Sequence, residues 1–201
     1  MSTLSTTNLK NPSSGSNNIV LNTDGSATIA TLSSTTIQGT IQTGTASGPH
    51  PLSPAVSAVD FANIPSWVKR ITVMFQGVST TGSSLMILQL GTGSTPTYTA
   101  SGYLSLSIRS ITTSGTSGTS GTAGFAISGA NTTGLFSGHA VLTNISTNSW
   151  ICSHVGKDST TITVHGGGDV SLAAALTAVR ITTVGGTDTF DAGSINILFE
   201  G

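Results

Sequence analysis

The residues that could do chemistry in this chain are few, and the histidines are the first to weigh. His139, His154 and His165 fall on three different predicted strands, and three histidines are a common ligand set for zinc. Nothing in their spacing places them at one depth, so three separate polar or half-buried side chains are the simpler interpretation. In a three-fold assembly, one histidine could instead meet its own copies on the axis and bind an ion. His50 lies between two prolines and suggests neither.

The acids are the second candidates, and six of the seven stand in or beside turn residues, where aspartate caps its own backbone. They are Asp24, Asp60, Asp158, Asp169, Asp188, Asp191 and Glu200. A glycosidase needs two carboxylates flanking a cleft. Asp188 and Asp191 are three apart across a turn, and turn chemistry explains them. With no phosphate loop, dinucleotide fingerprint, nucleophile elbow or zinc spacing, we predict no enzyme, no metal and no cofactor.

The remaining reactive side chains favour packing over chemistry. Cys152 lies in an apolar strand and is expected to be an inert buried thiol. Tyr98, Tyr103 and Trp150 could stack on sugar rings, although core packing is the better interpretation for Trp150. Lys69 and Arg70 open a strand, where they could guard its edge or form an ion pair between subunits.

The composition points to a charge-poor, all-β protein. The 201 residues include 66 serines and threonines and only six lysines and arginines against seven acids, for a net charge of −1. Such a balance provides no electrostatic footprint for nucleic acid or an anionic membrane. Serine, threonine and glycine are poor in helix interiors, whereas threonine, valine and isoleucine favour strands. No apolar run is long enough to span a membrane, and the first residues do not resemble a signal peptide.

Three regions follow one another along the chain. Residues 1–46 have thin apolar clusters, and Asp24-Gly25 predicts a hairpin between two short strands. This segment cannot bury a core alone, so we expect an extended or β-strand stalk that lies on its own copies or on a larger particle. Residues 47–60 hold three prolines and are predicted to be a linker. Residues 61–201 are predicted to form a jelly-roll-like β-sandwich.

Nine strands are predicted in this last region, with turns between them. Their ranges are 70–75, 85–90, 103–108, 124–128, 135–144, 150–155, 160–165, 177–184 and 193–200. The nearly continuous apolar run 85–90 indicates a strand buried on both faces. We expect the Ser-Gly-Thr triplets of 114–122 to form a flexible hairpin tip and Gly166–Asp169 to form a turn. Residues 171–178 are the one helix candidate, although they could equally begin a strand.

Several runs resemble a known family. Residues 9–29 (LKNPSSGSNNIVLNTDGSATI) resemble the N-terminal anchoring segment of short bacteriophage tail fibres. Residues 61–82 (FANIPSWVKRITVMFQGVSTTG), with 89–91, 101–103 and the closing run 185–200 (GGTDTFDAGSINILFE), are similar to the C-terminal β-domain of small fibre proteins of phages and prophages. The resemblance covers most of the chain.

The resemblance implies a virion structural protein that is a homotrimer, with a stalk fixed to the particle and a knob facing the host. Its partners would be its own copies, other tail or baseplate proteins of the virion, and a host surface glycan. The residues that correspond to the anchoring segment are Leu9, Asn11, Pro12, Asn17, Asn18, Ile19 and Leu21. No receptor-binding residue carries over, since these vary among such knobs.

Two other functions remain open beside a tail fibre that attaches to the host. One is a head fibre or capsid decoration protein without receptor binding. The other is a free carbohydrate-binding module or a depolymerase, and the lack of a carboxylate pair disfavours the enzyme.

Overall fold

The structure, a computed structural model, describes residues 8–9, 19–21, 27–29, 50–51, 56–129 and 134–201. The chain divides into two units, Met1–Thr40 and Ile41–Gly201. In the first unit, three short strands form an antiparallel sheet in the order β1-β2-β3: β1 (Asn8–Leu9), β2 (Ile19–Leu21) and β3 (Ala27–Ile29). Leu21 lies opposite Ala27, so the pairing of β2 with β3 predicted around Asp24-Gly25 is confirmed.

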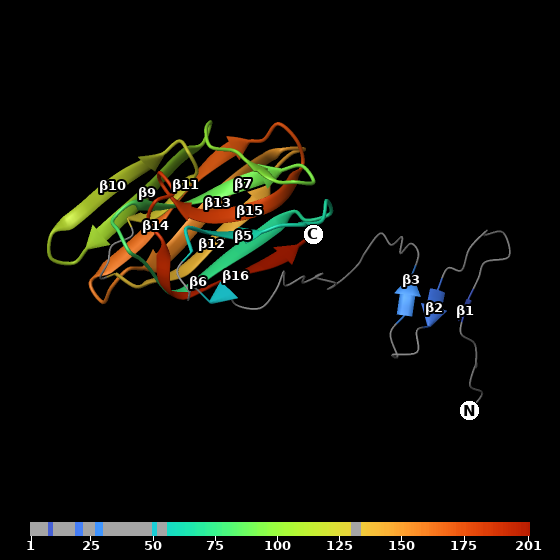
Figure 1. Cartoon of the computed structure of the whole chain (residues 1–201), viewed down its shortest axis with the longest axis horizontal. Coiled ribbons are helices and arrows are strands. Elements are labelled where there is room, and N and C mark those ends of the chain that lie inside the picture. The colour runs from blue at the N-terminus through green and yellow to red at the C-terminus, as the bar shows by residue number, and fades with distance from the viewer. Residues whose placement is uncertain (1–7, 10–18, 22–26, 30–49, 52–55, 130–133) are drawn as a thin grey trace, which may run out of the picture. The chain divides into compact units, whose positions relative to one another are not determined.

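The second unit consists of two antiparallel sheets, and its described residues contain no helix (Figure 1). The larger sheet has eight strands in the order β10-β9-β14-β13-β12-β6-β16-β4. Their bounds are β4 (His50–Pro51), β6 (Arg70–Thr80), β9 (Leu104–Ile111), β10 (Gly115–Gly121), β12 (Phe136–Asn144), β13 (Ser149–Lys157), β14 (Ile162–Ser171) and β16 (Phe190–Glu200).

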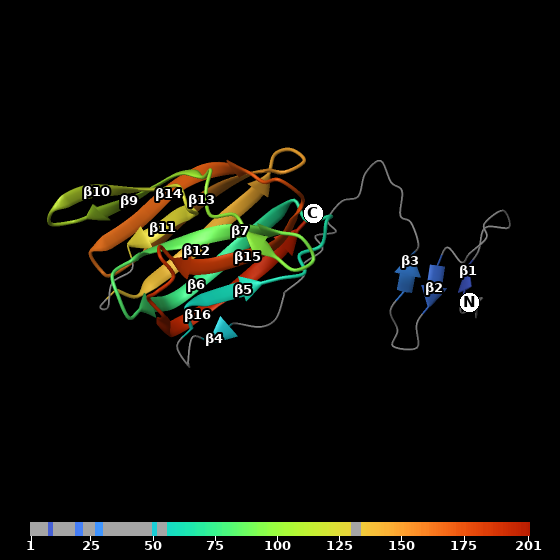
Figure 2. The ribbon, with the colours of Figure 1, turned by 45° about the horizontal axis from the view of Figure 1, so that its top comes forward.

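The smaller sheet has the order β11-β7-β15-β5, and β8 pairs with β7 beside this path. Its strands are β5 (Ala58–Phe61), β7 (Leu85–Thr92), β8 (Thr97–Tyr98), β11 (Phe125–Gly129) and β15 (Leu176–Thr183). In both ribbon views this sheet lies across one face of the larger one (Figure 2). The two sheets therefore form two layers.

Four pairs of consecutive strands each contribute one strand to the larger sheet and one to the smaller sheet, and the pairs follow one another in the same order in both sheets. The pairs are β4 with β5, β6 with β7, β11 with β12, and β15 with β16. In the larger sheet their members run β12-β6-β16-β4, and in the smaller sheet they run β11-β7-β15-β5. Strands β13, β14, β9 and β10 extend the larger sheet beyond β12.

The core lies between the layers because the strands alternate in hydrophobicity. In β13 the inward side chains Trp150, Cys152 and His154 are buried, whereas Ile151, Ser153 and Val155 between them are exposed. The largest fully buried rings are Tyr103, Phe125 and Phe190. Tyr103 and Phe125 meet edge to face, with ring centroids 4.9 Å apart, a favourable geometry for aromatic pairs.

All nine predicted strands overlap strands of the structure, and the prediction of an all-β unit is confirmed. Residues 86–91 of β7 are all buried, as expected for a strand covered on both faces. The structure adds β5 and β8, which are short. Strands β4 and β5 lie wholly or partly within residues 47–60, the range predicted as a linker.

Two predictions based on glycine content are wrong. The Ser-Gly-Thr triplets form β10, which pairs with the preceding strand β9 from Gly115 to Gly121. Residues 166–168 are the middle of β14, not a turn. In both cases backbone pairing with a neighbouring strand overrides the weak local preference of the residues. Of the two alternatives for residues 171–178, the beginning of a strand is confirmed, since β15 begins at Leu176.

Replacing Gly168 by alanine is expected to destabilise the fold by about 1–3 kcal/mol, the usual cost of overpacking. A Cβ at this position would lie 2.8 Å from the Cα of Ser105 and closer still to the carbonyl oxygen of Leu104. These are backbone atoms of the neighbouring strand β9, so they cannot rotate away. The measurement is urea unfolding followed by circular dichroism.

Gly118→Ala is the matched control for this prediction. Gly118 is also mid-strand, but its nearest neighbour would be the flexible side-chain tip of Ile108 at 3.1 Å. We expect a change of no more than about 0.5 kcal/mol. Equal losses for both variants would contradict the role assigned to the close approach of β14 and β9.

Candidate functional site

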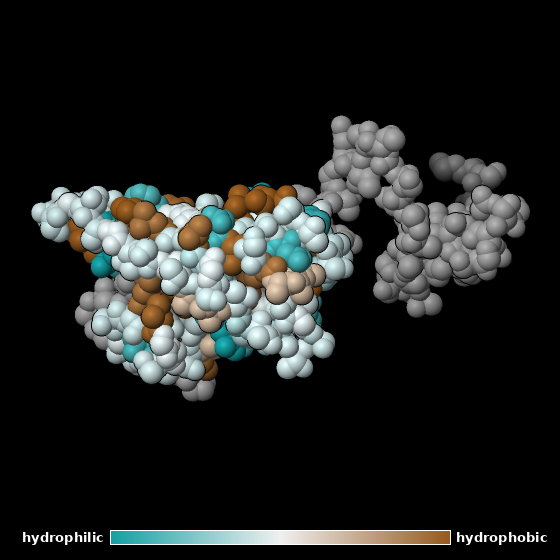
Figure 3. Space-filling view, turned by 90° about the horizontal axis from the view of Figure 1, so that it is seen from above, coloured by the Kyte–Doolittle hydropathy of each residue, from teal (hydrophilic) through white to brown (hydrophobic). Residues whose placement is uncertain are grey.

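The outer face of the larger sheet is unusually apolar for a surface that the second unit itself leaves uncovered. An antiparallel sheet with one solvated face normally places polar residues there. Here Leu104 and Leu106 of β9 and Ile151 and Val155 of β13 are between 41% and 69% exposed. In Figure 3 apolar patches lie within a surface of nearly neutral hydropathy. We call these four residues the apolar face.

Strand β14 lies between the two halves of the apolar face and places the exposed Asp169 and His165, with Gly167 between them, on the same side of the sheet. Gly167 of β14 lies opposite Leu106 on one side and Ser153 on the other. Since glycine has no side chain, it leaves a depression of about 350 Å³, lined in part by Leu104, Leu106 and Gly168. Such a shallow apolar depression can receive a side chain from another molecule.

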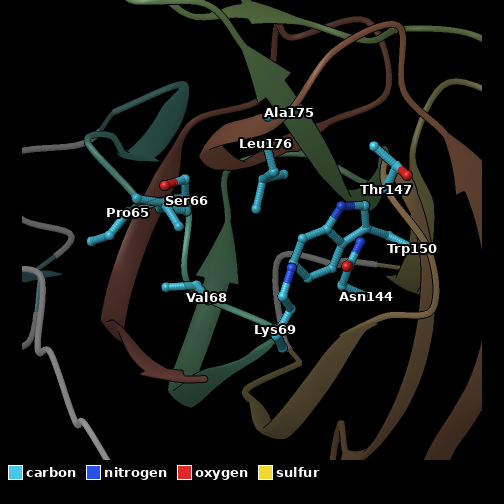
Figure 4. A pocket seen from close by; sticks show the side chains of 10 residues that line it. Pro65, Ser66, Val68, Lys69, Asn144, Thr147, Trp150, Ala175 and Leu176 are labelled. Carbon is cyan, nitrogen blue, oxygen red and sulfur yellow. The ribbon is translucent and has the colours of Figure 1, made fainter. Parts of the chain in front are cut away.

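A second hollow, the end pocket, opens at one end of the sandwich and involves three connections between strands. Its lining comes from the segment before β6, from the turn between β12 and β13, and from the link into β15: Ile64, Pro65, Ser66, Val68, Lys69, Asn144, Thr147, Trp150, Ala175 and Leu176 (Figure 4). Backbone bonds hold the connections together. The N–H of Asn144 donates to the carbonyl of Lys69, and the N–H of Leu172 donates to the carbonyl of Asn148.

The polar side chains of the end pocket are Ser66, Lys69, Asn144, Thr147 and Trp150, of which only Lys69 and Trp150 are donors alone. The indole N–H of Trp150 is buried and has no partner, and an unsatisfied buried donor is costly. Lys69 is exposed and takes part in none of the three ion pairs found among the described residues. None of the lining residues is acidic.

Four aspartates are engaged with distant side chains or backbone, so the prediction that they cap their own turns is wrong for these four. Asp60 accepts two bonds of 2.7 Å from Arg180, and Asp158 accepts one of 2.7 Å from Arg109. Asp191 accepts a bond from Ser79, and Asp188 accepts one from the backbone N–H of Ser84, which lowers its pKa. Glu200 lies 3.5 Å from Arg70.

Two of these ion pairs differ in their surroundings. The Asp158 side chain is 3% exposed and that of Arg109 25%, so this pair is largely removed from water. The Arg180 pair is more open, and its guanidinium lies 3.9 Å from the centre of the Tyr98 ring. Burial, followed by the charge of Asp60, raises the pKa of Tyr98. The prediction that Lys69 and Arg70 could pair between subunits is not tested.

The three strand histidines do not come together. His139 and His165 are exposed, whereas His154 is buried between the layers. The Nε2 of His154 lies 3.1 Å from the hydroxyl of Ser107, which donates to the carbonyl of Ile127. Nε2 therefore carries the hydrogen, and Nδ1 has no partner. Burial, and then the nearby His165, lower the pKa of His154 to about 4.

The other reactive residues are mainly structural. Cys152 is buried, as predicted, and burial raises its pKa to about 12, which disfavours the reactive thiolate. Tyr103 is fully buried, and its hydroxyl accepts the N–H of Leu90; burial raises its pKa to about 12. Trp150 is 3% exposed. Neither ring can stack on a sugar, so that interpretation remains only for Tyr98.

The anchoring residues suggested by the family resemblance lie in the first unit. Leu9 pairs with Ile19 in the short sheet, and Leu21 lies opposite Ala27. Asn11, Pro12, Asn17 and Asn18 lie outside the described residues.

The described residues lack two features that would point to a function, a metal-binding cluster and a membrane-spanning helix. They contain no group of three histidine, cysteine or acidic side chains that could hold a metal ion. They also contain no helix of the length and hydrophobicity needed to cross a membrane.

The fold and the site define an all-β protein with two antiparallel sheets, exposed apolar side chains on one sheet face and an end pocket whose one charged residue is Lys69. Comparisons with known proteins add no family: no family model, no curated protein and no solved structure matches the chain.

Proposed function

We propose that this chain is the subunit of a homotrimeric phage virion fibre that attaches to the host cell surface through a glycan. The observation that carries the proposal is the apolar face of the eight-stranded sheet. Burying it against copies of the same chain would remove from water the exposed part of four apolar side chains, at about 25 cal/mol per Å² of apolar area. With a net charge of −1, neighbouring copies repel one another little.

The strand order supports a jelly roll as the core of this knob. Two interleaved sets of four strands, β12-β6-β16-β4 and β11-β7-β15-β5, are the arrangement in which a folded antiparallel ribbon rolls up on itself. Jelly rolls occur in viral capsid and lectin domains, which suits a virion protein that binds sugars. The short sheet of β1, β2 and β3 fits a stalk, because a sheet of so few short strands is marginal alone and becomes stable by packing on another element.

The oligomeric state tests the proposal directly. Light scattering should give three times the 20.1-kDa chain mass. Leu106→Lys and Val155→Lys should each shift the protein to monomers, because neither position has an acidic residue directly opposite and a buried lysine would lose its hydration. Leu135→Lys is the control, since Leu135 is 51% exposed but precedes β12 and is not part of this face.

A monomeric wild-type chain at micromolar concentration would contradict the proposal. So would a trimer that neither lysine variant disturbs. Attachment is tested separately, by binding of the labelled trimer to host cells. Immunogold labelling of the virion then distinguishes a tail fibre from a head fibre or capsid decoration protein.

A further inference from the structure

We propose that the end pocket binds the carboxylate of an acidic sugar, such as a uronic acid, in the host glycan. This inference rests on the proposed function, since it names the chemistry by which the knob would contact its receptor. It is drawn from the lining of the pocket rather than from the apolar face.

Trp150 provides a buried hydrogen-bond donor that has no partner. Trp150 is 3% exposed, and its indole nitrogen exposes less than 1 Å² without a hydrogen-bond partner. Leaving such an N–H unpaired costs about 1–3 kcal/mol. The ring lines the pocket, and an acceptor that paired with this N–H would recover the cost.

Lys69 gives the end pocket a positive charge. Lys69 is the single charged residue of the lining, and it has no acidic partner there. Figure 4 shows Lys69 and Trp150 as two of the side chains that line this pocket. The hydroxyls of Ser66 and Thr147 add two further groups that can donate. Lys69 is a cation with no carboxylate in the same lining, which favours an anion over a cationic ligand.

The small volume of the end pocket limits which part of a sugar can enter it. The pocket holds about 30 Å³, which is about the volume that one water molecule occupies in the liquid. A planar carboxylate can enter such a space, whereas a sugar ring cannot. The ring would remain at the rim, where Trp67, which is 39% exposed, and Ile145, which is 62% exposed, leave apolar surface on two of the segments that supply the lining.

The two indole N–H signals provide a direct readout, because the chain has only two tryptophans. In ¹H–¹⁵N spectra of the full chain, Trp67→Phe removes one signal and so identifies that of Trp150. Sodium glucuronate should shift the Trp150 signal, whereas glucose, which lacks the carboxylate, should not. Lys69→Gln should weaken glucuronate binding about tenfold or more, since it removes the charged donor.

Lys157→Gln is the matched control, because Lys157 is also an exposed lysine but lies outside the end pocket. It should bind glucuronate like the wild type. The proposal is overturned if glucose shifts the signal equally, if Lys69→Gln binds unchanged, or if glucuronate produces no shift at all. The last result would mean that the pocket takes only water.

Failure of this inference can be told apart from failure of the proposed function. A trimer that attaches to host cells without any effect of glucuronate or of Lys69→Gln contradicts the end pocket alone. A chain that neither forms trimers nor attaches to cells contradicts the fibre itself.

Discussion

Replacing Asp158 by alanine is expected to destabilise the protein by about 3–5 kcal/mol, the cost of breaking a buried ion pair by removing one partner. The Asp158 side chain is 3% exposed, and its contact with Arg109 is 2.7 Å long. Without the carboxylate, the guanidinium is left partly buried with no counter-charge. Its Nε has no partner even in the wild type. Urea unfolding at neutral pH measures the loss.

Two further variants show whether the ion pair is the cause. Glu200→Ala removes the partner of Arg70, whose side chain is 54% exposed, and should cost no more than about 1 kcal/mol, as exposed pairs do. The double variant Arg109→Met/Asp158→Leu should recover much of the loss, because it leaves no buried charge behind. A loss below about 1 kcal/mol for Asp158→Ala would contradict the prediction.

The second large effect is a loss of stability in mild acid that depends on His154. Burial lowers the pKa of this side chain from 6.5 to about 4 in the folded protein. Above pH 6.5 the imidazole is neutral in both states and the full stability is present. Between pH 6.5 and pH 4 only the unfolded chain gains the proton, so the free energy of unfolding falls as the pH falls. The total loss is about 3 kcal/mol and levels off below pH 4.

The difference between the wild type and His154→Leu isolates this contribution from that of the acids. Urea unfolding at a series of pH values should give a steeper fall for the wild type between pH 6.5 and pH 4. His139→Gln is the control, because His139 is exposed and should leave the slope unchanged. Equal slopes for the wild type and His154→Leu would show that the buried imidazole does not control acid stability.

Local patterns in the sequence were sufficient for the strands but not for their partners. Alternation along β13 and the continuous apolar run of β7 depend only on which residues face the core, so both could be predicted. The glycine-rich segments of β10 and β14 could not, since nothing local distinguishes a turn from a strand that is held by pairing with its neighbours in the sheet.

Less of the candidate site than of the fold could be predicted from the sequence. Trp150 was assigned to the core by its apolar strand, but only the tertiary structure shows that its N–H is unpaired and that it lines a pocket with Lys69 and Thr147. These residues lie on three separate connections, and no spacing along the chain indicates that they meet. The same holds for Asp158 and Arg109, which are 49 positions apart.

Composition and periodicity by themselves determined that this chain is all-β, charge-poor and built of short strands, because backbone preference and alternating burial act over a few neighbouring residues. The tertiary structure alone decided that the acids form long-range ion pairs and contacts, that His154 is buried and His165 is not, and that one sheet face is left apolar. These features depend on which strands pair and in which register, and register is set by the packing of the whole sandwich.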